Sequence, residues 1–503
     1  MHGNYSRSDC LVHGVCADSR TVAPGYLFAA LPGAHVHGAK FAACSVERGA
    51  VAILTDAEGL LMLQADGVEV PVIVDPAPAQ HLGAIAAKLY GEPAAALRTF
   101  AVTGTNGKTT TTFLLDHLLG KLSRCTGLIG TVEIRLGDDA VPAHLTTPQP
   151  ADLQAMLAQL RAAGGNDLVM EVSSHALTQG RTDPICYSVA GFTNLSQDHL
   201  DFHHNMDAYF DAKASLFTPQ KAQRAVICVD DDWGRRLFNQ VTIPATALAV
   251  HSDLGGRPGW QVDDVRLGKF GEATRFVMRR SDGASLELAT SLPASFNVAN
   301  LALAVAMLIE GGVSVEAARQ TIGECVNVYV PGRMEIVSQR PQVVVDFAHN
   351  VESLDLVLTS LRAQTHEQLI VVTGSAGDRD REKRAAMGHA VARGADVVII
   401  TDDDPHSEDP AQIRAALLAG TRTVPNAVVH EIDDRSEAIR AAIKMAGPDD
   451  IVLIAGRGHE AVQAVGDAEI KLDDRQVARE AVQSTAVSAP SASMSTPVPA
   501  LKG

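Results

Sequence analysis

The chain has 503 residues, a formal net charge of −17, 46% hydrophobic residues and 20% charged residues. This length accommodates about three domains of ordinary size, and the apolar fraction is sufficient for buried cores. The negative charge excludes a general nucleic-acid-binding role, because a phosphate backbone requires a basic surface. A small anionic substrate is not excluded, since it needs only a local cluster of cations.

Cysteine usage and the N-terminus indicate a soluble protein. The seven cysteines are scattered and show no C-x-x-C spacing, which is typical of reduced thiols in the cytosol. Residues 1–5 contain no apolar signal core, and the longest apolar run, 301–309, is too short to cross a bilayer. We therefore expect a cytoplasmic protein without membrane insertion.

Residues 1–95 combine a polar turn at 18–25 with short alternating apolar segments. This pattern is typical of a small α/β domain. The expected strands are 27–31, 51–54 and 72–74, and the expected helices are 40–48 and 82–90.

The second block, residues 96–330, opens on an apolar β-branched run that ends in a glycine-punctuated turn and continues into leucines at helical spacing. In such a strand–loop–helix unit the glycines let successive N–H groups point inward, where the helix N-terminus adds positive potential for a phosphate. Lys108 supplies a charge for the β- and γ-phosphates of ATP, and the Thr109 hydroxyl is a ligand for Mg²⁺. The loop residues are Gly104, Thr105, Asn106, Gly107, Lys108, Thr109 and Thr110.

One position departs from the general nucleotide loop. Val102 stands where that pattern has a glycine, so only its second half matches. A glycine-rich turn without a ligand is the alternative. The Gly-Lys-Thr sequence at the carboxyl end of a strand favours an ATP site.

The rest of the second block alternates strands (168–172, 188–193, 225–229) with helices, which predicts a parallel sheet covered on both faces. Ligands of such a sheet gather beyond the carboxyl ends of its strands. Residues 261–292 alternate polar and apolar side chains, as a small antiparallel insertion does, and 297–309 is an expected helix.

Three side chains in this block are candidates for metal chemistry. Glu171 ends a predicted strand, where a carboxylate can bind Mg²⁺, although charged strand ends are often simply solvated. His199 lies in a segment rich in His and Asp, for which surface decoration is the alternative. By itself, Lys213 has the pattern of an ordinary helix lysine.

The third block, residues 331–484, begins at Pro331-Gly332-Arg333 and again alternates strands with helices, which favours a second doubly wound domain. From residue 485 to 503 the chain is mostly Ser, Ala, Pro and Val and cannot build a core, so we expect a disordered tail. The expected strands are 343–347, 369–373, 397–401 and 451–455.

Taken in order, these segments resemble the Mur ligase family over nearly the whole chain except the tail. The resemblance implies an α/β fold of three domains, with a central P-loop ATPase domain and a Rossmann-like C-terminal domain. The matching motifs are TGTNGKTT at 103–110, TTP at 146–148, EVSSHAL at 171–177, TNLSQDHLDFH at 193–203, AKASLF at 212–217, PGRME at 331–335 and GDRDREKR at 377–384.

The resemblance implies an enzyme that phosphorylates a carboxylate with ATP and then joins the acyl phosphate to an amine. Lys108, Glu171, His199 and Lys213 would be catalytic, with Mg²⁺ bound by Thr109, Glu171, His199 and a carbamylated Lys213. A carbamate presents the anionic oxygens that hard cations prefer, and it forms only from a neutral amine. Asn300, Arg333, Asp346 and His349 would contact the nucleotide.

The implied substrates are UDP-N-acetylmuramoyl-L-alanyl-D-glutamate and a diamino acid, meso-diaminopimelate or L-lysine, bound by a monomer in peptidoglycan synthesis. The first substrate would contact Ser19, Arg20, Thr146, Thr147, Ser173 and Arg181. The amino acid would contact Arg379, Asp403, Asp404, His406, Gly456 and Glu460.

The chain departs from the family at the amino-acid site. The family has Asp-Asn-Pro-Arg, whose arginine binds the far carboxylate of diaminopimelate, where this chain has Asp403-Asp404-Pro405-His406. A histidine is a weaker and less specific partner for a carboxylate than a guanidinium. The added charge of Asp404 could favour a distal amine, and Arg457 stands where lysine is usual.

Three alternatives follow from these departures. The chain could be a paralogue that joins another amino acid to a different carboxylate, or a ligase similar to folylpolyglutamate synthase. It could also be a non-catalytic relative that binds nucleotide. Ser19 and Arg20 argue against the folate version, while Lys108, Thr109, Glu171 and Lys213 argue against loss of catalysis.

Overall fold

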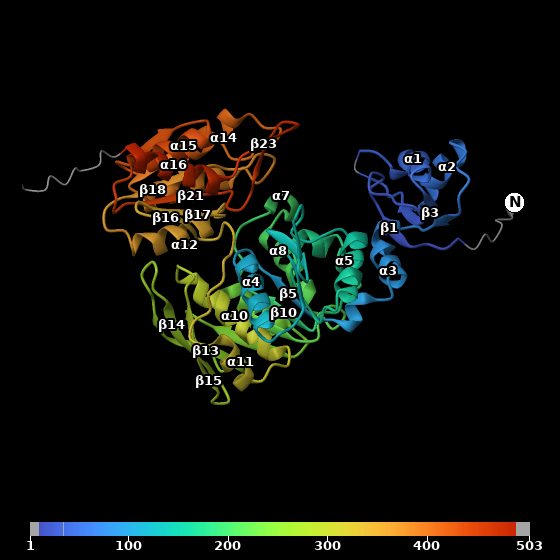
Figure 1. Cartoon of the computed structure of the whole chain (residues 1–503), viewed down its shortest axis with the longest axis horizontal. Helices are drawn as coiled ribbons and strands as arrows, with labels where there is room; N and C mark the ends of the chain where they lie inside the picture. Colours follow the sequence, from blue (N-terminus) through green and yellow to red (C-terminus); the bar gives the residue numbers. More distant parts are fainter. Residues whose placement is uncertain (1–9, 34, 489–503) are drawn as a thin grey trace, which may run out of the picture. The chain divides into compact units, whose positions relative to one another are not determined.

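The computed structural model describes residues 10–33 and 35–488. It contains two compact units that separate between Val328 and Tyr329 (Figure 1). The division into three domains at 95 and 330 therefore remains a prediction. The expected absence of a signal core at residues 1–5 and the tail from 489 onwards lie outside the described residues.

The first unit begins with a four-stranded parallel sheet in the order β1-β2-β3-β4. Its apolar strands pack against α3, and Ala151 of α5 belongs to the same core as Leu82 and Ala86, which joins this sheet's core to the segment that follows. The strands are β1 (Gly14–Cys16), β2 (Tyr26–Ala29), β3 (Ala50–Thr55) and β4 (Val72–Val74). The helices are η1 (Gly38–Phe41), α1 (Ala42–Glu47), α2 (Ala57–Ala65) and α3 (Pro78–Leu89).

The same unit contains an eleven-stranded sheet in the order β15-β14-β13-β12-β11-β10-β5-β9-β6-β7-β8. Seven neighbouring strands, from β13 to β6, are parallel, and antiparallel strands extend the sheet at both edges. The strands are β5 (Arg98–Thr103), β6 (Thr126–Ile129), β7 (Glu133–Leu136), β8 (Asp139–Pro142), β9 (Asp167–Glu171), β10 (Val189–Phe192), β11 (Ala225–Cys228), β12 (Ala245–Ala249), β13 (Gly259–Arg266), β14 (Thr274–Arg280) and β15 (Ser285–Thr290).

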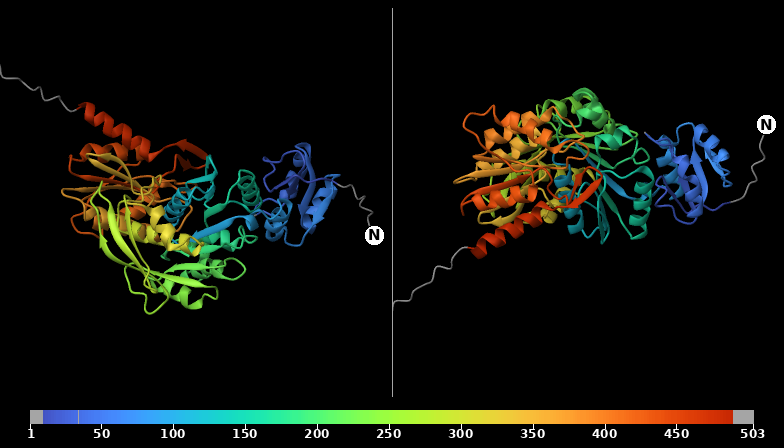
Figure 2. Two further views of the ribbon diagram at one scale, coloured as in Figure 1. Left: turned by 60° about the horizontal axis from the view of Figure 1, so that its bottom comes forward. Right: turned by 90° about the horizontal axis from the view of Figure 1, so that it is seen from above.

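Figure 2 shows β13–β15 in yellow-green as an extension of this sheet. The expected antiparallel pairing over residues 261–292 is confirmed, and the segment forms an edge of the main sheet because β13 pairs in parallel with β12. Helix α10 packs beside α4. The helices are η2 (Pro93–Ala96), α4 (Lys108–Lys121), α5 (Pro150–Ala162), α6 (Ser174–Thr178), α7 (Leu200–His203), α8 (Met206–Ala214), η3 (Ser215–Phe217), α9 (Asp232–Gln240), α10 (Phe296–Glu310) and α11 (Val315–Ile322).

The second unit has a six-stranded sheet in the order β16-β17-β21-β18-β19-β20, parallel except for β16, and a separate hairpin of β22 and β23. Figure 1 shows α12 on the opposite side of this sheet from α15 and α16. The strands are β16 (Glu335–Gln339), β17 (Gln342–Asp346), β18 (Leu369–Thr373), β19 (Val397–Ile400), β20 (Val428–Glu431), β21 (Ile451–Ala455), β22 (Val462–Val465) and β23 (Ala468–Lys471). The helices are α12 (Val351–Arg362), α13 (Lys383–Gly394), α14 (Pro410–Thr421), α15 (Arg435–Met445) and α16 (Asp474–Ser488).

Helix α16 extends beyond residue 484, where we expected the third domain to end. Residues 485–488, which we expected in a tail without structure, are its last turn, because Val477, Ala478 and Ala481 pack the helix into the core of the second unit. Among the described residues, no helix is long and apolar enough to cross a membrane.

Candidate active site

The loop between β5 and α4 has the conformation that its glycines permit. Gly104 has φ +145° and Gly107 φ +88°, both in the region that disfavours other residues. A side chain at Gly104 would clash with the Thr193 hydroxyl, and one at Gly107 with the Asn300 amide oxygen. The loop therefore approaches its neighbours closely and leads into the N-terminus of α4, where an anion is favoured.

Asn194, which follows β10, holds this loop in place. The Asn106 N–H donates to Asn194 Oδ1 (2.9 Å), and Asn194 Nδ2 donates back to the Asn106 carbonyl (3.2 Å). The Thr105 N–H donates to the Asn194 carbonyl at 3.0 Å. Sequence reasoning missed Asn194, although its position at the carboxyl end of the strand next to β5 could have indicated it.

Lys108 and Lys213 converge on one carbonyl. Lys108 Nζ donates to the carbonyls of Gly104 (3.0 Å) and Thr105 (2.9 Å), and Lys213 Nζ donates to the same Gly104 oxygen at 2.8 Å. Lys213 is 1% exposed. Burial, and then the charge of Lys108, lower the pKa of Lys213 well below its usual value. The structure thus places Lys213 beside the loop as a buried amine, not as an ordinary surface lysine.

Tyr209 connects α8 to the same loop. Its hydroxyl lies 3.2 Å from Thr105 Oγ1, and Lys213 Nζ lies 4.6 Å from the centre of its ring. We expect Tyr209→Phe to lower the free energy of unfolding by about 1 kcal/mol, because Thr105 loses a buried partner while the ring stays. Thermal unfolding of the variant and the parent measures this, and an unchanged midpoint would contradict it.

Three histidines lie together near these lysines. The ring centres of His175 and His199 are 4.8 Å apart, those of His175 and His203 are 5.6 Å apart, and His203 Nε2 lies 2.9 Å from Ser174 Oγ. Burial lowers the pKa of His199 to about 3 and that of His203 to about 4. Both imidazoles are therefore neutral at pH 7, the form that binds metal ions.

Glu171 is fully buried at the end of β9. Its carboxylate accepts hydrogen bonds from the Thr131 N–H (2.9 Å) and the Thr131 hydroxyl (3.0 Å). The Thr131 hydroxyl also lies 3.1 Å from Thr146 Oγ1. Thr131 was not predicted from the sequence, because nothing in its local pattern distinguishes it from other threonines.

Thr147, Ser173 and Arg181 form a connected group next to Glu171. The Thr147 hydroxyl donates to the Glu171 carbonyl (2.9 Å) and accepts from the Ser173 N–H (3.1 Å). Arg181 Nη1 donates to the Thr147 carbonyl at 2.8 Å. The structure thus brings these predicted substrate residues to the same strand end as the carboxylate.

The side chains around the loop supply part of a metal site. Within residues 10–33 and 35–488, no three His, Cys, Asp or Glu side chains form a preformed metal cluster. Mg²⁺ is usually held by one or two carboxylates together with substrate phosphates and water. The buried carboxylate of Glu171, the neutral His199 and the Thr109 hydroxyl fit that incomplete type of site.

Asn300 on α10 contacts the loop region from another direction. Its Oδ1 accepts from the Thr111 hydroxyl at 3.4 Å, and its Nδ2 donates to Asn297 Oδ1 at 2.9 Å. By contrast, Ser19 and Arg20 lie on a turn of the first sheet's block, where the exposed Arg20 pairs with Asp18 at 2.7 Å.

In the second unit, Arg333, Asp346 and His349 gather around Phe347. The Arg333 guanidinium lies 4.3 Å from the centre of that ring, and His349 Nδ1 lies 2.7 Å from the Phe347 carbonyl. Asp346 accepts from the N–H groups of Met334 (2.7 Å) and Ala348 (2.8 Å). Burial raises the pKa of Asp346, and Arg333 opposes this rise.

The residues that we predicted to bind the amino-acid substrate lie after β19 and β21, except Arg379, which follows β18. Gly456 has φ +119° and lies against Asp403, so a side chain there would contact that carboxylate. Burial and the charges of Asp403 and Asp404 raise the pKa of Glu460 to about 8. Arg379 is exposed on a nearby loop whose Gly377 N–H donates to the Asp404 carbonyl (2.8 Å).

Asp404 and Arg457, two departures from the family pattern, contact each other. Arg457 is 0% exposed, and its Nη1 forms an ion pair with Asp404 Oδ1. The negative charge that we expected Asp404 to offer a substrate is thus balanced within the chain. His406 lies two residues further on, with φ +49°.

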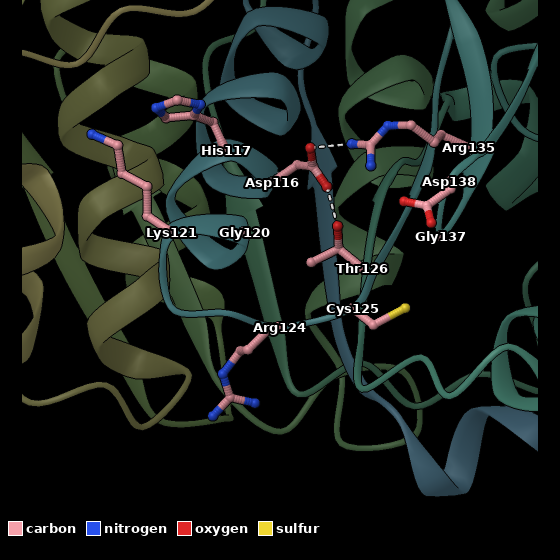
Figure 3. A pocket seen from close by; sticks show the side chains of 10 residues that line it. All are labelled: Asp116, His117, Gly120, Lys121, Arg124, Cys125, Thr126, Arg135, Gly137 and Asp138. Atoms are coloured by element: carbon pink, nitrogen blue, oxygen red, sulfur yellow. Dashed lines mark hydrogen bonds and ion pairs between the residues drawn. The ribbon is translucent and has the colours of Figure 1, made fainter.

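A cavity of about 570 Å³ lies at the other end of α4 from the loop (Figure 3). It contains none of the predicted site residues. Asp116, on its wall, accepts from the Thr126 hydroxyl (2.7 Å) and pairs with Arg135, which ties α4 to β6 and β7. This cavity is therefore separate from the carboxyl ends of the strands, where the candidate site lies.

Comparison with known proteins agrees with this arrangement. Family profiles described as Mur ligase family, catalytic domain, Mur ligase middle domain, and Mur ligase, glutamate ligase domain match residues 11–90, 102–308 and 332–458. A Streptomyces coelicolor protein named UDP-N-acetylmuramoyl-L-alanyl-D-glutamate–2,6-diaminopimelate ligase is 41% identical over 94% of this chain and 93% of its own length. A Leifsonia xyli protein named UDP-N-acetylmuramyl-tripeptide synthetase is 42% identical, covering 94% and 92%.

A solved structure of a UDP-N-acetylmuramoyl-L-alanyl-D-glutamate–2,6-diaminopimelate ligase matches with a TM-score of 0.63 and 31% identity, over 94% of this chain and 95% of that one. The profiles and relatives together span both units. On the strength of this coverage and of the loop, helix and strand-end geometry described above, the chain belongs to the Mur ligase family.

Proposed function

We propose that this chain is an ATP-dependent ligase that joins the amine of meso-diaminopimelate to the D-glutamyl carboxylate of UDP-N-acetylmuramoyl-L-alanyl-D-glutamate, a step in peptidoglycan precursor synthesis. The convergence of Lys108 and Lys213 on the Gly104 carbonyl carries this proposal, because it places a cationic group and a buried amine of lowered pKa at the turn that a nucleotide phosphate would occupy. The names of relatives about 41% identical over most of the chain support the substrates.

The phosphate loop, residues 104–110, would bind the ATP phosphates, and Asn300, Arg333, Asp346 and His349 would contact the rest of the nucleotide. Thr109, Glu171, His199 and a carbamylated Lys213 would hold Mg²⁺, which supplies charge neutralisation when bound. Lys213 fits carbamylation because its amine is buried and its pKa is low, and CO₂ reacts only with the neutral amine.

The reaction has two steps. The glutamyl carboxylate oxygen attacks the γ-phosphorus of ATP, which forms an acyl phosphate and releases ADP. The substrate amine then attacks the acyl carbon, loses a proton, and expels phosphate from a tetrahedral intermediate. Lys108 contributes mainly by positioning the phosphates and balancing their charge, as is usual in phosphoryl transfer.

Each of the two substrates would have its own set of contacts. Ser19 and Arg20 would bind the uridine diphosphate end, and Thr146, Thr147, Ser173 and Arg181 the peptide. Arg379, Asp403, His406, Gly456 and Glu460 would bind the amino acid, with His406 in place of the family's arginine at the far carboxylate. Asp404 would belong to the same site through its ion pair with Arg457. We further propose a cytoplasmic monomer, in agreement with the scattered free cysteines of the described chain.

Phosphate release measured with ATP, UDP-N-acetylmuramoyl-dipeptide and one amino acid at a time tests the proposal. We expect release to require all three substrates and to be faster with diaminopimelate than with L-lysine. Release with L-lysine but not with diaminopimelate would correct the identity of the amino-acid substrate and leave the proposed reaction unchanged. No release with either amino acid would contradict the proposed role in peptidoglycan synthesis.

A further inference from the structure

The hairpin formed by β22 and β23 needs an anchor. It pairs with neither edge of the six-stranded sheet, and most of its residues are exposed or half-buried. An isolated two-stranded hairpin is only marginally stable in water. Its conformation must therefore depend on contacts with the rest of the second unit.

Arg457 supplies that anchor from a fully buried position. Its Nη2 donates to the carbonyl of Val462 at 2.5 Å, where the hairpin begins, and to that of Leu472 at 3.4 Å, just after it ends. Its Nη1 pairs with Asp404 Oδ1, on the segment 403–406. One guanidinium thus joins both ends of the hairpin to that segment.

Further hydrogen bonds run between the hairpin and the same segment. The Ala464 N–H donates to Asp404 Oδ1 (3.2 Å), and Gln463 Nε2 donates to the Asp403 carbonyl (2.5 Å). The His406 N–H donates to the Ala464 carbonyl (3.1 Å), and the Gly466 N–H donates to the His406 carbonyl (2.7 Å). Together with the Arg457–Asp404 pair, these contacts attach the hairpin to segment 403–406 at several points.

The hairpin contacts His406 at a point where the backbone has an unusual conformation. Its φ of +49° is unfavourable for a residue with a side chain, and such a conformation persists only where the surroundings determine it. Two hydrogen bonds with the hairpin, one donated by the His406 N–H and one accepted by its carbonyl, hold both peptide groups of His406. We expect the loss of these two bonds to change the backbone conformation of His406 and the direction of its imidazole.

We propose that Arg457 and Asp404 are a positioning pair that fastens the hairpin to segment 403–406 and thereby sets the direction of His406 toward the far end of the amino-acid substrate. The substrate part of this inference rests on the proposed function. The attachment itself rests only on the contacts within the second unit. The pair acts through His406 and need not touch the substrate.

A double-mutant cycle with two independent readouts tests the proposal. The variants are Asp404→Leu, which removes both contacts of Oδ1, Arg457→Met and the double variant. Arg393→Met is the control, because Arg393 forms an exposed pair with Asp355. We expect each single variant to raise the KM for diaminopimelate about tenfold or more and to leave the KM for ATP within about twofold. The double variant should be no worse than the worse single variant, because the two side chains act as a unit.

Amide hydrogen exchange in the full-length protein provides the second readout. Amides of residues 462–471 should exchange at least about tenfold faster in the single variants, while those of β18 and β21 remain as slow as in the parent. Unchanged exchange in the hairpin would overturn the proposal. Equal rises in both KM values, or effects that multiply in the double variant, would overturn it as well.

The two proposals fail separately. A parent protein that does not turn over diaminopimelate contradicts the proposed function, while hydrogen exchange still decides whether the pair fastens the hairpin. Should Arg457→Met fail to fold, Asp404→Leu decides the question, because it removes both contacts of Oδ1 and leaves the guanidinium bound to Val462.

Discussion

Replacement of Lys213 by methionine is expected to lower turnover by about 10²- to 10³-fold or more, as the loss of a group that stabilises transition-state charge does. The reason is that methionine cannot be carbamylated and so offers no anionic oxygens to Mg²⁺. Phosphate release under saturating substrates measures the effect, and retention of most of the turnover would contradict the role proposed for Lys213.

The same substitution should not reduce stability. Lys213 is 1% exposed, so folding buries its amine at a cost, and the Gly104 carbonyl that it contacts also accepts from Lys108 at 3.0 Å. Methionine has a similar length and keeps the cavity filled. We therefore expect an unchanged or raised melting temperature together with lost turnover, which separates a chemical role from a structural one.

Two controls sharpen this test. Lys121→Met, on the exposed end of α4, should change neither turnover nor stability appreciably. Lys213→Ala leaves a cavity, so a small carboxylate such as acetate should restore part of its turnover, whereas Lys213→Met should not respond. A ¹³C carbamate signal in parent protein supplied with ¹³C-bicarbonate, absent from both Lys213 variants, gives a readout that does not depend on activity.

The sequence predicted the strands that carry the site, because their local signal is strong. The apolar run before Gly104 forms β5, and Glu171 is the last residue of β9, as expected. Such strands are easy to predict because parallel strands covered on both faces are continuously apolar. Short edge strands such as β7, β8 and β20 were not predicted. Their residues are half exposed and resemble loops, so their pairing is visible only in the folded sheet.

Site residues could be predicted from the sequence where the residue type and its motif have one common use. They could not be predicted where the role of a residue depends on a partner far away in the sequence. The loop glycines and Lys108 belong to the first kind. Asn194, Thr131 and Tyr209 belong to the second, because each acts by contacting a loop far away in the sequence. Asp404 is a further example. From the sequence, its charge suggested a substrate with a distal amine, but in the folded chain that charge is paired with Arg457.

Loss of Asp474 is expected to destabilise the second unit by about 3–5 kcal/mol, the cost of leaving one partner of a buried ion pair without the other. The side chains of Asp474 and Arg435 are both 0% exposed, and they form two hydrogen bonds of 2.8 and 2.9 Å. Burial alone would lower the pKa of Arg435, but the attraction of Asp474 outweighs it and raises that pKa. Because arginine keeps its charge in proteins, the buried guanidinium of Asp474→Ala stays charged without its main partner.

The pair also joins the first residues of α15 and α16 to the end of β21, because Arg435 Nη2 donates to the Ala455 carbonyl at 2.9 Å. Denaturant unfolding of the Asp474→Ala variant measures the loss. Arg440→Ala is the matched control, since its pair with Glu437 is exposed and should be worth less than about 1 kcal/mol. The double variant Arg435→Met/Asp474→Leu should recover much of the loss, because apolar side chains replace both charges. Equal losses in the single and double variants would show that packing, not the unpaired charge, sets the cost.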